Sequence, residues 1–71
     1  MLGLEHPNLA IRLNNLAFLY QVQGRYTEAE PLYRRSLGIF EKVLGKGHRS
    51  TETVRANYAS LQKEMKQEGK G

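Results

Sequence analysis

The stretch NNLAFLYQVQGRYTEAEPLYRRSL, residues 14–37, decides the fold of this chain. Small and aromatic residues recur on both sides of Gly24 at spacings of three and four, which is the period of an α-helix. Glycine takes the left-handed conformation that ends a helix at little steric cost, so Gly24 is expected to stop the first helical run. The stretch therefore predicts two consecutive helices joined by a short turn.

Signals on either side give the expected helix boundaries. The first helix is expected over about residues 7–22, because Pro7 suits a first turn, where its missing N–H would have had no partner. The second is expected over about residues 26–44, where Thr27 and Glu30 have the spacing of a capping box. Each of these two side chains could then accept a free backbone N–H at the start of that helix.

A third helix is expected over about residues 51–67. Its apolar residues form one stripe at spacings of four, three and four, and its other positions are mostly charged or amide residues. The stripe consists of Val54, Tyr58, Leu61 and Met65. A helix that is apolar on one side only is typical of the end of a structure. We therefore predict an all-α fold over residues 1–71 as a single domain, an antiparallel helical hairpin followed by a C-terminal capping helix.

The chain also contains an internal repeat. LGLEHPNLAIRLNNLAFL from Leu2 returns as LGKGHRSTETVRANYASL from Leu44, a shift of 42 residues. Six positions are identical without a gap, where chance gives about one. They are Leu2/Leu44, Gly3/Gly45, His6/His48, Asn15/Asn57, Ala17/Ala59 and Leu19/Leu61. The third helix therefore begins a second unit and is expected to cover the first hairpin. The opening Leu-Gly matches the tail of a second helix, which favours origin in a longer array.

The pattern from His6 to Leu37, HP-x-x-A-x-x-L-x-N-L-A-x-L-Y-x-x-x-G-x-Y-x-E-A-E-P-L-Y-x-R-S-L, resembles a tetratricopeptide repeat. The period and the Leu-Gly…His-Pro junction are similar to the kinesin-light-chain variety. The resemblance implies a fragment of an α–α superhelix. The residues expected to pack or turn are Leu13, Leu16, Ala17, Tyr20, Gly24, Tyr26, Ala29, Tyr33 and Leu37, with Val54, Tyr58 and Leu61 in the third helix. The second unit departs from the pattern at Arg49, Arg55 and Gln62.

The resemblance also implies a function. In tetratricopeptide arrays the first helix of each unit lines a concave groove, and the asparagine of an N-L-A motif commonly binds the backbone of an extended peptide. Asn15 and Asn57 are thus candidate peptide-binding residues, with Asn14 beside them. The other candidates share the helical face of Asn15, namely Ile11, Phe18, Gln21 and Val22. The alternative is that the asparagines only form hydrogen bonds within the helical stack. The expected partner is a protein or an extended peptide.

The same apolar positions support a second candidate function. Ile11, Phe18 and Val22 are expected to point away from the hairpin, where they could hold a ligand or a second copy of the chain. We therefore expect a homo-oligomer, with a two-fold dimer favoured. Exchange of the third helix through Gly45-Lys46-Gly47 is one route to it. A self-associating structural unit without a separate ligand is the alternative to peptide binding.

Composition argues against several other functions. The net charge is +4 and the pI is near 9.7, but the basic residues are spread along the chain among glutamates, as on a solvated surface. Nucleic-acid binding is therefore the least favoured alternative. No apolar run is long enough to span a membrane, and no secretory leader follows Met1, so a cytoplasmic location is expected.

Catalytic and metal chemistry are not expected either. The chain has no cysteine, and its two histidines, His6 and His48, lie one repeat apart without the short ligand spacing of a metal site. Glu28 and Glu30 point in different directions on a helix and do not form a carboxylate pair. No serine or threonine has a recognisable base partner. We therefore expect no enzyme activity, no cofactor and no metal.

Overall fold

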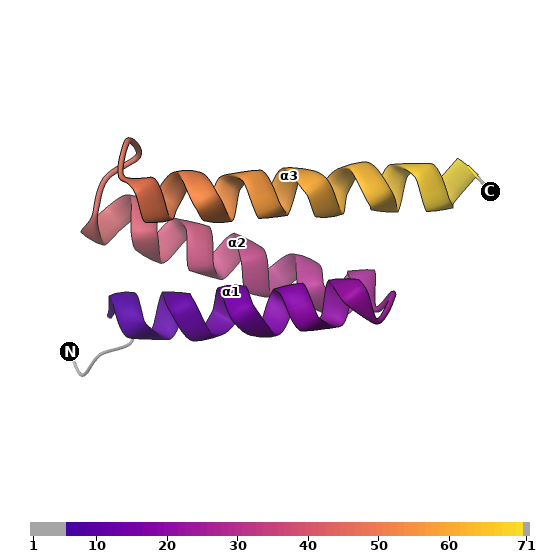
Figure 1. Cartoon of the computed structure of the whole chain (residues 1–71), viewed down its shortest axis with the longest axis horizontal. Coiled ribbons are helices and arrows are strands. Elements are labelled where there is room, and N and C mark those ends of the chain that lie inside the picture. Colours follow the sequence, from indigo (N-terminus) through magenta and orange to yellow (C-terminus); the bar gives the residue numbers. More distant parts are fainter. Residues whose placement is uncertain (1–5, 71) are drawn as a thin grey trace.

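The computed structural model describes residues 6–70, with side chains described as far as Gln67, and this part folds into three helices. Helix α1 runs over Pro7–Val22, α2 over Tyr26–Val43 and α3 over Arg49–Lys70. Figure 1 shows α1 and α2 as an antiparallel hairpin, with α3 lying along α2 and pointing the same way as α1. The predicted all-α fold, a hairpin with a third helix packed on it, is confirmed.

The ends of the helices follow from local signals. The Nδ1 atom of His6 accepts the backbone N–H of Asn8 at 3.0 Å, so His6 caps α1, and Pro7 occupies its first turn. Gly24 and Gly45 have φ angles of +80° and +92°, which L-residues with a Cβ rarely adopt. The two glycines therefore end α1 and α2, and for Gly24 this confirms the prediction.

The predicted capping box at the start of α2 does not form. The N-cap residue is Arg25, which makes no side-chain capping bond, and Thr27 lies inside the first turn. The carboxylate of Glu30 accepts a hydrogen bond from the Tyr58 hydroxyl at 2.5 Å and pairs with Arg34. These partners, the Tyr58 hydroxyl first, lower the pKa of Glu30. The prediction is wrong because Glu30 turns toward α3 and its own helix surface instead of back to the backbone.

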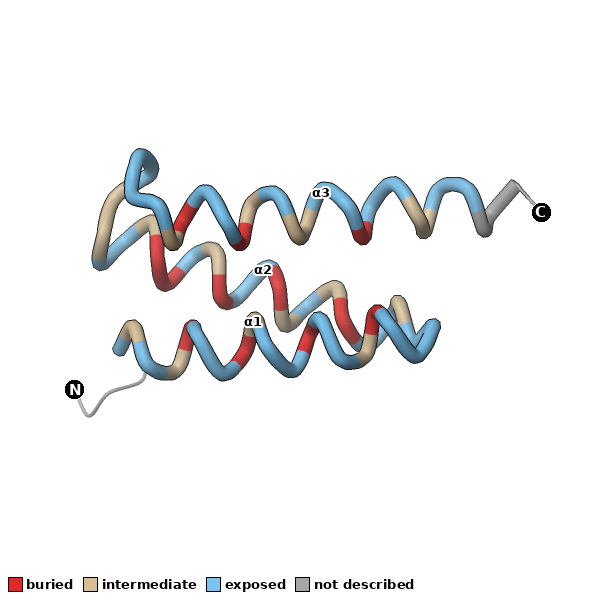
Figure 2. The backbone as a smooth tube through the Cα atoms, in the orientation of Figure 1, coloured by how far each residue is buried: buried red, intermediate tan, exposed pale blue. Residues whose placement is uncertain are grey.

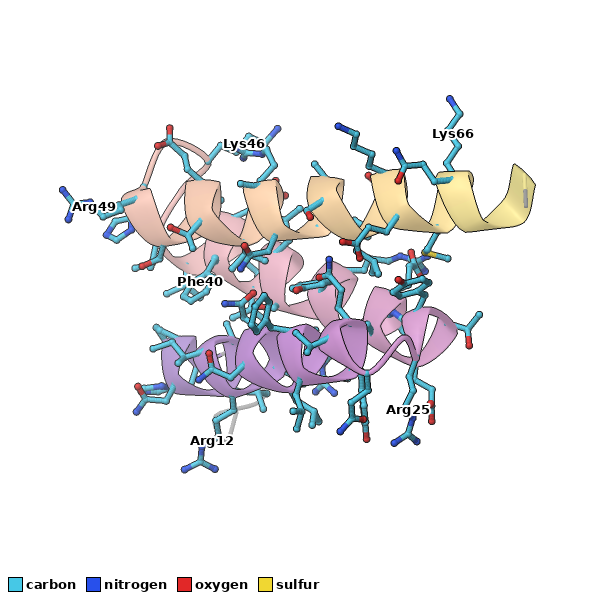
Figure 3. All side chains as sticks on the ribbon, turned by 45° about the vertical axis from the view of Figure 1, so that its right-hand side comes forward. Arg12, Arg25, Phe40, Lys46, Arg49 and Lys66 are labelled. Carbon is cyan, nitrogen blue, oxygen red and sulfur yellow. The ribbon has the colours of Figure 1, made fainter. Side chains whose placement is uncertain are left out.

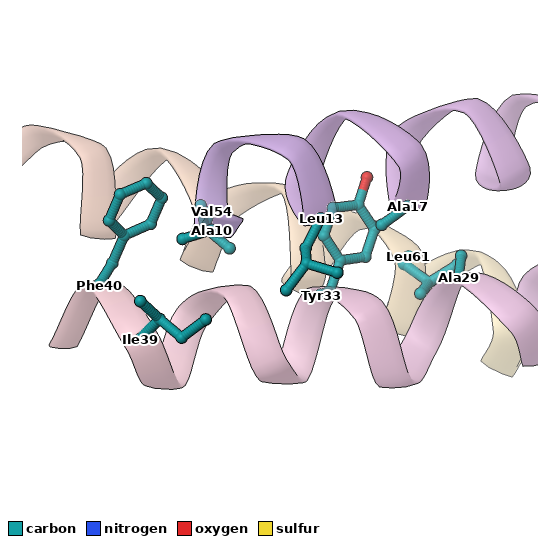
Figure 4. Packing of buried hydrophobic residues seen from close by; sticks show 9 residues of the cluster. All are labelled: Ala10, Leu13, Ala17, Ala29, Tyr33, Ile39, Phe40, Val54 and Leu61. Atoms are coloured by element: carbon teal, nitrogen blue, oxygen red, sulfur yellow. The ribbon is translucent and has the colours of Figure 1, made fainter. Parts of the chain in front are cut away.

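The interface between α1 and α2 depends on small residues. Ala10 and Ala17 on α1 and Ala29 on α2 are fully buried, which lets the two backbones approach closely (Figure 4). The Tyr33 side chain fills the space between them and is also fully buried. The Ser36 hydroxyl donates to the backbone carbonyl of Ala10 at 2.6 Å, so the hairpin is joined by a buried hydrogen bond as well.

Leu16 differs from its predicted role in packing. Its side chain is 39% exposed, because the buried stripe of α1 follows Ala10, Leu13, Ala17 and Gln21 and leaves Leu16 at its edge. Conversely, Ala10 and Ile39 are buried although the helical pattern did not single them out. The other predicted packing side chains lie in the core or against it, namely Leu13, Ala17, Tyr20, Tyr26, Ala29, Tyr33, Leu37, Val54, Tyr58 and Leu61.

Helix α3 packs mainly on α2. Val54 and Leu61 are buried, while Tyr58 and Met65 are partly buried against the same core. In Figure 2 the buried positions of α3 lie on the side that faces α2, and its outer side is exposed. The ring centroids of Tyr33 and Tyr58 are 6.2 Å apart, which continues the core from the hairpin into the third helix.

Polar contacts fix the linker between α2 and α3. The Thr51 hydroxyl donates to the carbonyl of Gly45 at 2.7 Å, and Thr51 is fully buried. Arg55 donates to the carbonyl of Lys46 at 3.3 Å and lies 3.5 Å from the carboxylate of Glu41. Arg55, which departs from the repeat pattern, therefore holds the turn in place.

Candidate functional site

A groove lies between the outer faces of α1 and α3. It has a volume of about 670 Å³ and is lined by Asn14, Asn15, Phe18, Leu19, Val22 and Asn57. Five of these residues come from two turns of α1, and Asn57 comes from the repeat-related position on α3. Figure 3 shows the labelled basic side chains Arg12, Arg25, Lys46 and Lys66 pointing outward at the periphery. The groove itself is uncharged.

The polar part of the groove is a pair of amides. The Nδ2 atom of Asn57 donates to the Oδ1 atom of Asn14 at 3.2 Å, so this hydrogen bond joins the two helices across the groove floor. An amide offers two N–H donors and two acceptor lone pairs, and this bond uses one donor of Asn57 and one lone pair of Asn14. Asn15 is exposed beside this pair. The groove can therefore offer both donors and acceptors to a bound backbone.

The apolar part of the groove is unusually exposed. Phe18, Leu19 and Val22 are 53%, 51% and 67% exposed. Clustered apolar side chains next to polar groups are typical of surfaces that bind another molecule. Leu19 was not among the predicted site residues, although it lies one helical turn after Asn15, a spacing that could have revealed it.

Gln21 is not part of this groove, so the prediction that it faces a ligand is wrong. Its side chain is buried and accepts a hydrogen bond from the Tyr33 hydroxyl at 2.7 Å. Its Nε2 atom donates to Glu64 at 3.0 Å and to Ser60 at 3.4 Å. Burial, and secondly the charge of Glu64, raise the pKa of Tyr33, so its hydroxyl keeps the proton that it donates. Gln21 therefore joins all three helices.

Ile11 lies beside the groove rather than in it. It lines a smaller hollow of about 160 Å³ with Asn14, Phe40, Arg49, Ser50, Thr53 and Val54. Asn14 belongs to both hollows, so the outer face of α1 is continuous from Ile11 to Val22. The structure thus brings six of the seven predicted ligand-facing residues to one face and takes Gln21 into the core.

A family model for the tetratricopeptide repeat matches residues 3–70, which is nearly the whole chain. The chain belongs to the tetratricopeptide repeat family. No curated protein and no solved structure gives a significant match. Tetratricopeptide repeats generally bind proteins and are typically non-catalytic.

The tetratricopeptide unit has a further hollow between α2 and α3. It measures about 420 Å³ and is lined by Thr27, Glu30, Gln62 and Met65. The carboxylate of Glu30 is already engaged by Tyr58 and Arg34. This hollow therefore has fewer hydrogen-bond donors and acceptors available to a ligand than the asparagine groove.

The histidines of the tetratricopeptide unit cap helices. His48 accepts the backbone N–H of Ser50 at 3.0 Å through Nδ1, as His6 does for Asn8. Within the part of the chain that the structure describes, no group of three or more histidine, cysteine or acidic side chains could hold a metal ion. The helices described over residues 6–70 include none that is long and apolar enough to cross a membrane.

Proposed function

We propose that this tetratricopeptide unit binds an extended peptide segment of a partner protein in the groove between α1 and α3. The observation that carries the proposal is the combination of amide and exposed apolar side chains in one uncharged groove. The amides of Asn15 and Asn57 are suited to the N–H and C=O groups of an extended backbone, which a peptide offers whatever its sequence. Phe18, Leu19 and Val22 are suited to apolar side chains of that peptide.

The length of α1 limits the length of the bound segment. Helix α1 has 16 residues, which at the rise of an α-helix is about 24 Å. An extended peptide of about seven residues spans this distance. Since neighbouring side chains of an extended chain point to opposite sides, alternate residues of the peptide would face the groove.

We further infer that the unit is of the kinesin-light-chain-like variety. The 42-residue shift between the two copies and the repeated Leu-Gly and His residues at the junction support this inference. It concerns the type of repeat and carries no claim about a particular motor protein or cargo.

The test is selection of ligands from a library of random peptides of about ten residues, followed by calorimetry with each selected peptide. We expect Asn15→Ala and Phe18→Ala to weaken binding about tenfold or more, which corresponds to the loss of about 1.4 kcal/mol. Val43→Ala is the matched control, because Val43 is an exposed apolar residue on α2 outside the groove. Failure to select any peptide, or an equal loss in the Val43 control, would contradict the proposal.

A further inference from the structure

The outward face of α1 has the spacing of a coiled-coil seam. Asn8, Ile11, Asn15, Phe18 and Val22 follow one another at intervals of three, four, three and four residues. In a two-stranded coiled coil the positions that meet the partner helix have this alternation, and they are called a and d. Here Asn8, Asn15 and Val22 occupy a positions, and Ile11 and Phe18 occupy d positions. We call these five residues the α1 seam.

The α1 seam lies on the opposite side of the helix from the hairpin core. Ala10, Leu13 and Ala17 are buried against α2, whereas the three apolar seam residues are each about half exposed or more. Arg12 is the one charged residue in the sequence of α1. A helix that is apolar on both sides is typical of an interior position, where a neighbour covers each side.

We propose that the α1 seam pairs with the α1 seam of a second copy of this chain, in parallel, across a two-fold axis. A two-fold contact uses the same surface on both partners, so that surface must be self-complementary. The α1 seam is uncharged, although each chain carries a net charge of +4. Its central residue, Asn15, is both donor and acceptor, so two Asn15 amides can satisfy each other across the axis.

Asn15 also sets the direction of pairing. In parallel pairs an a position meets the a position of the partner, and a single asparagine there specifies register and two-stranded assembly. Antiparallel pairing would place Asn15 opposite the apolar Phe18 and leave its amide without a polar partner. Arg12 flanks the seam at an e position, where the parallel register puts it beside Pro7 of the partner subunit rather than beside another cation.

Pairing would occupy the peptide groove, because Asn15, Phe18 and Val22 belong to both surfaces. This consequence rests on the proposed function. A peptide that binds the groove would then dissociate the dimer, and dimerisation would weaken peptide binding at high chain concentration. Exchange of α3 is not needed for this dimer, since α3 stays packed on its own α2.

The first test is sedimentation equilibrium of the chain alone, without any peptide. The seam has only about two heptads, so we expect weak association. The chain concentration must therefore be varied from about 10 μM to about 1 mM. We expect the mass to rise from 8.1 kDa toward twice that value. Phe18→Glu and Val22→Lys should remain monomeric, whereas Val43→Glu, a charge on an exposed apolar site of α2, should dimerise like the parent chain.

The direction of pairing is tested with an introduced thiol, since the chain has no cysteine. Val22→Cys should form a disulfide between two identical copies under mild oxidation if pairing is parallel. Crosslinking only in a mixture of Val22→Cys with Ile11→Cys would instead show antiparallel pairing and overturn the proposed direction. A mass of 8.1 kDa throughout the range would overturn the dimer itself. Neither result bears on the peptide selection, which is carried out at low chain concentration.

Discussion

Replacement of Gln21 by methionine tests the buried hydrogen bonds that join the three helices. Methionine has a similar length and can occupy the same space, but its thioether is only a weak acceptor for the Tyr33 hydroxyl and has no donor for Glu64. Tyr33 is fully buried, and its hydroxyl lies 2.7 Å from the side-chain oxygen Oε1 of Gln21. Gln21→Met therefore deprives a buried hydroxyl of its strong acceptor.

A buried polar group that loses its partner costs about 1–3 kcal/mol of folding free energy. For a chain of this size each kcal/mol lowers the melting temperature by roughly 4–8 °C. Gln21→Met should therefore melt at a clearly lower temperature than the parent. Tyr33→Phe removes the hydroxyl that has lost its acceptor. The double variant should therefore be more stable than the sum of the losses in Gln21→Met and Tyr33→Phe implies. The expected coupling between the two sites is about 1 kcal/mol or more.

Circular dichroism of the four chains of this cycle, in both thermal and urea unfolding, measures the coupling. Gln62→Met is the matched control, because Gln62 is exposed on α3 and should change stability by less than about 0.5 kcal/mol. Equal melting temperatures for the parent and Gln21→Met would refute the reasoning, as would additive losses in the double variant. Either result would mean that the buried bond contributes nothing to stability.

Four further variants each change a single residue. Gly38→Ala should raise stability by about 1 kcal/mol, because Gly38 lies inside α2 and among the described residues no atom outside its own helix backbone comes within 4 Å of the added Cβ. Gly24→Ala, measured in the same melts, should lower stability instead, since its φ of +80° is strained for alanine, and a gain there would contradict the assignment of the turn. Ala17→Leu should lower the free energy of unfolding, measured with urea, by about 1–3 kcal/mol, because Ala17 is fully buried between α1 and α2. An unchanged urea midpoint would show that the interface can accommodate the larger side chain. Asn15→Ala should reduce the affinity for selected peptides but shift the free energy of unfolding by less than about 0.5 kcal/mol, and a large loss of stability with affinity kept would make Asn15 structural.

The local features of this protein could be predicted from the sequence. The helical period and the helix stop at Gly24 are short-range properties that depend on a few neighbouring residues, and the 42-residue repeat is found by comparing the sequence with itself. The apolar stripe of the third helix also indicated which of its side chains would cover the hairpin. Val54, Tyr58 and Leu61 belong to that stripe, and they lie in the core or against it.

The tertiary structure decided which partners the polar side chains meet. Gln21 does not share the helical face of Asn15, because six residues turn a helix by about 240°, and it lies four residues after Ala17 on the buried stripe of α1. Spacing within α1 does not show that its amide donates to Ser60 and Glu64, which come from α3, 39 and 43 residues further along the chain. Glu30 turns away from its expected capping position for the same reason, since Tyr58 comes from α3. Residue spacing specifies which side chains share a face of a helix, but the packing of a distant helix determines how far that face is covered.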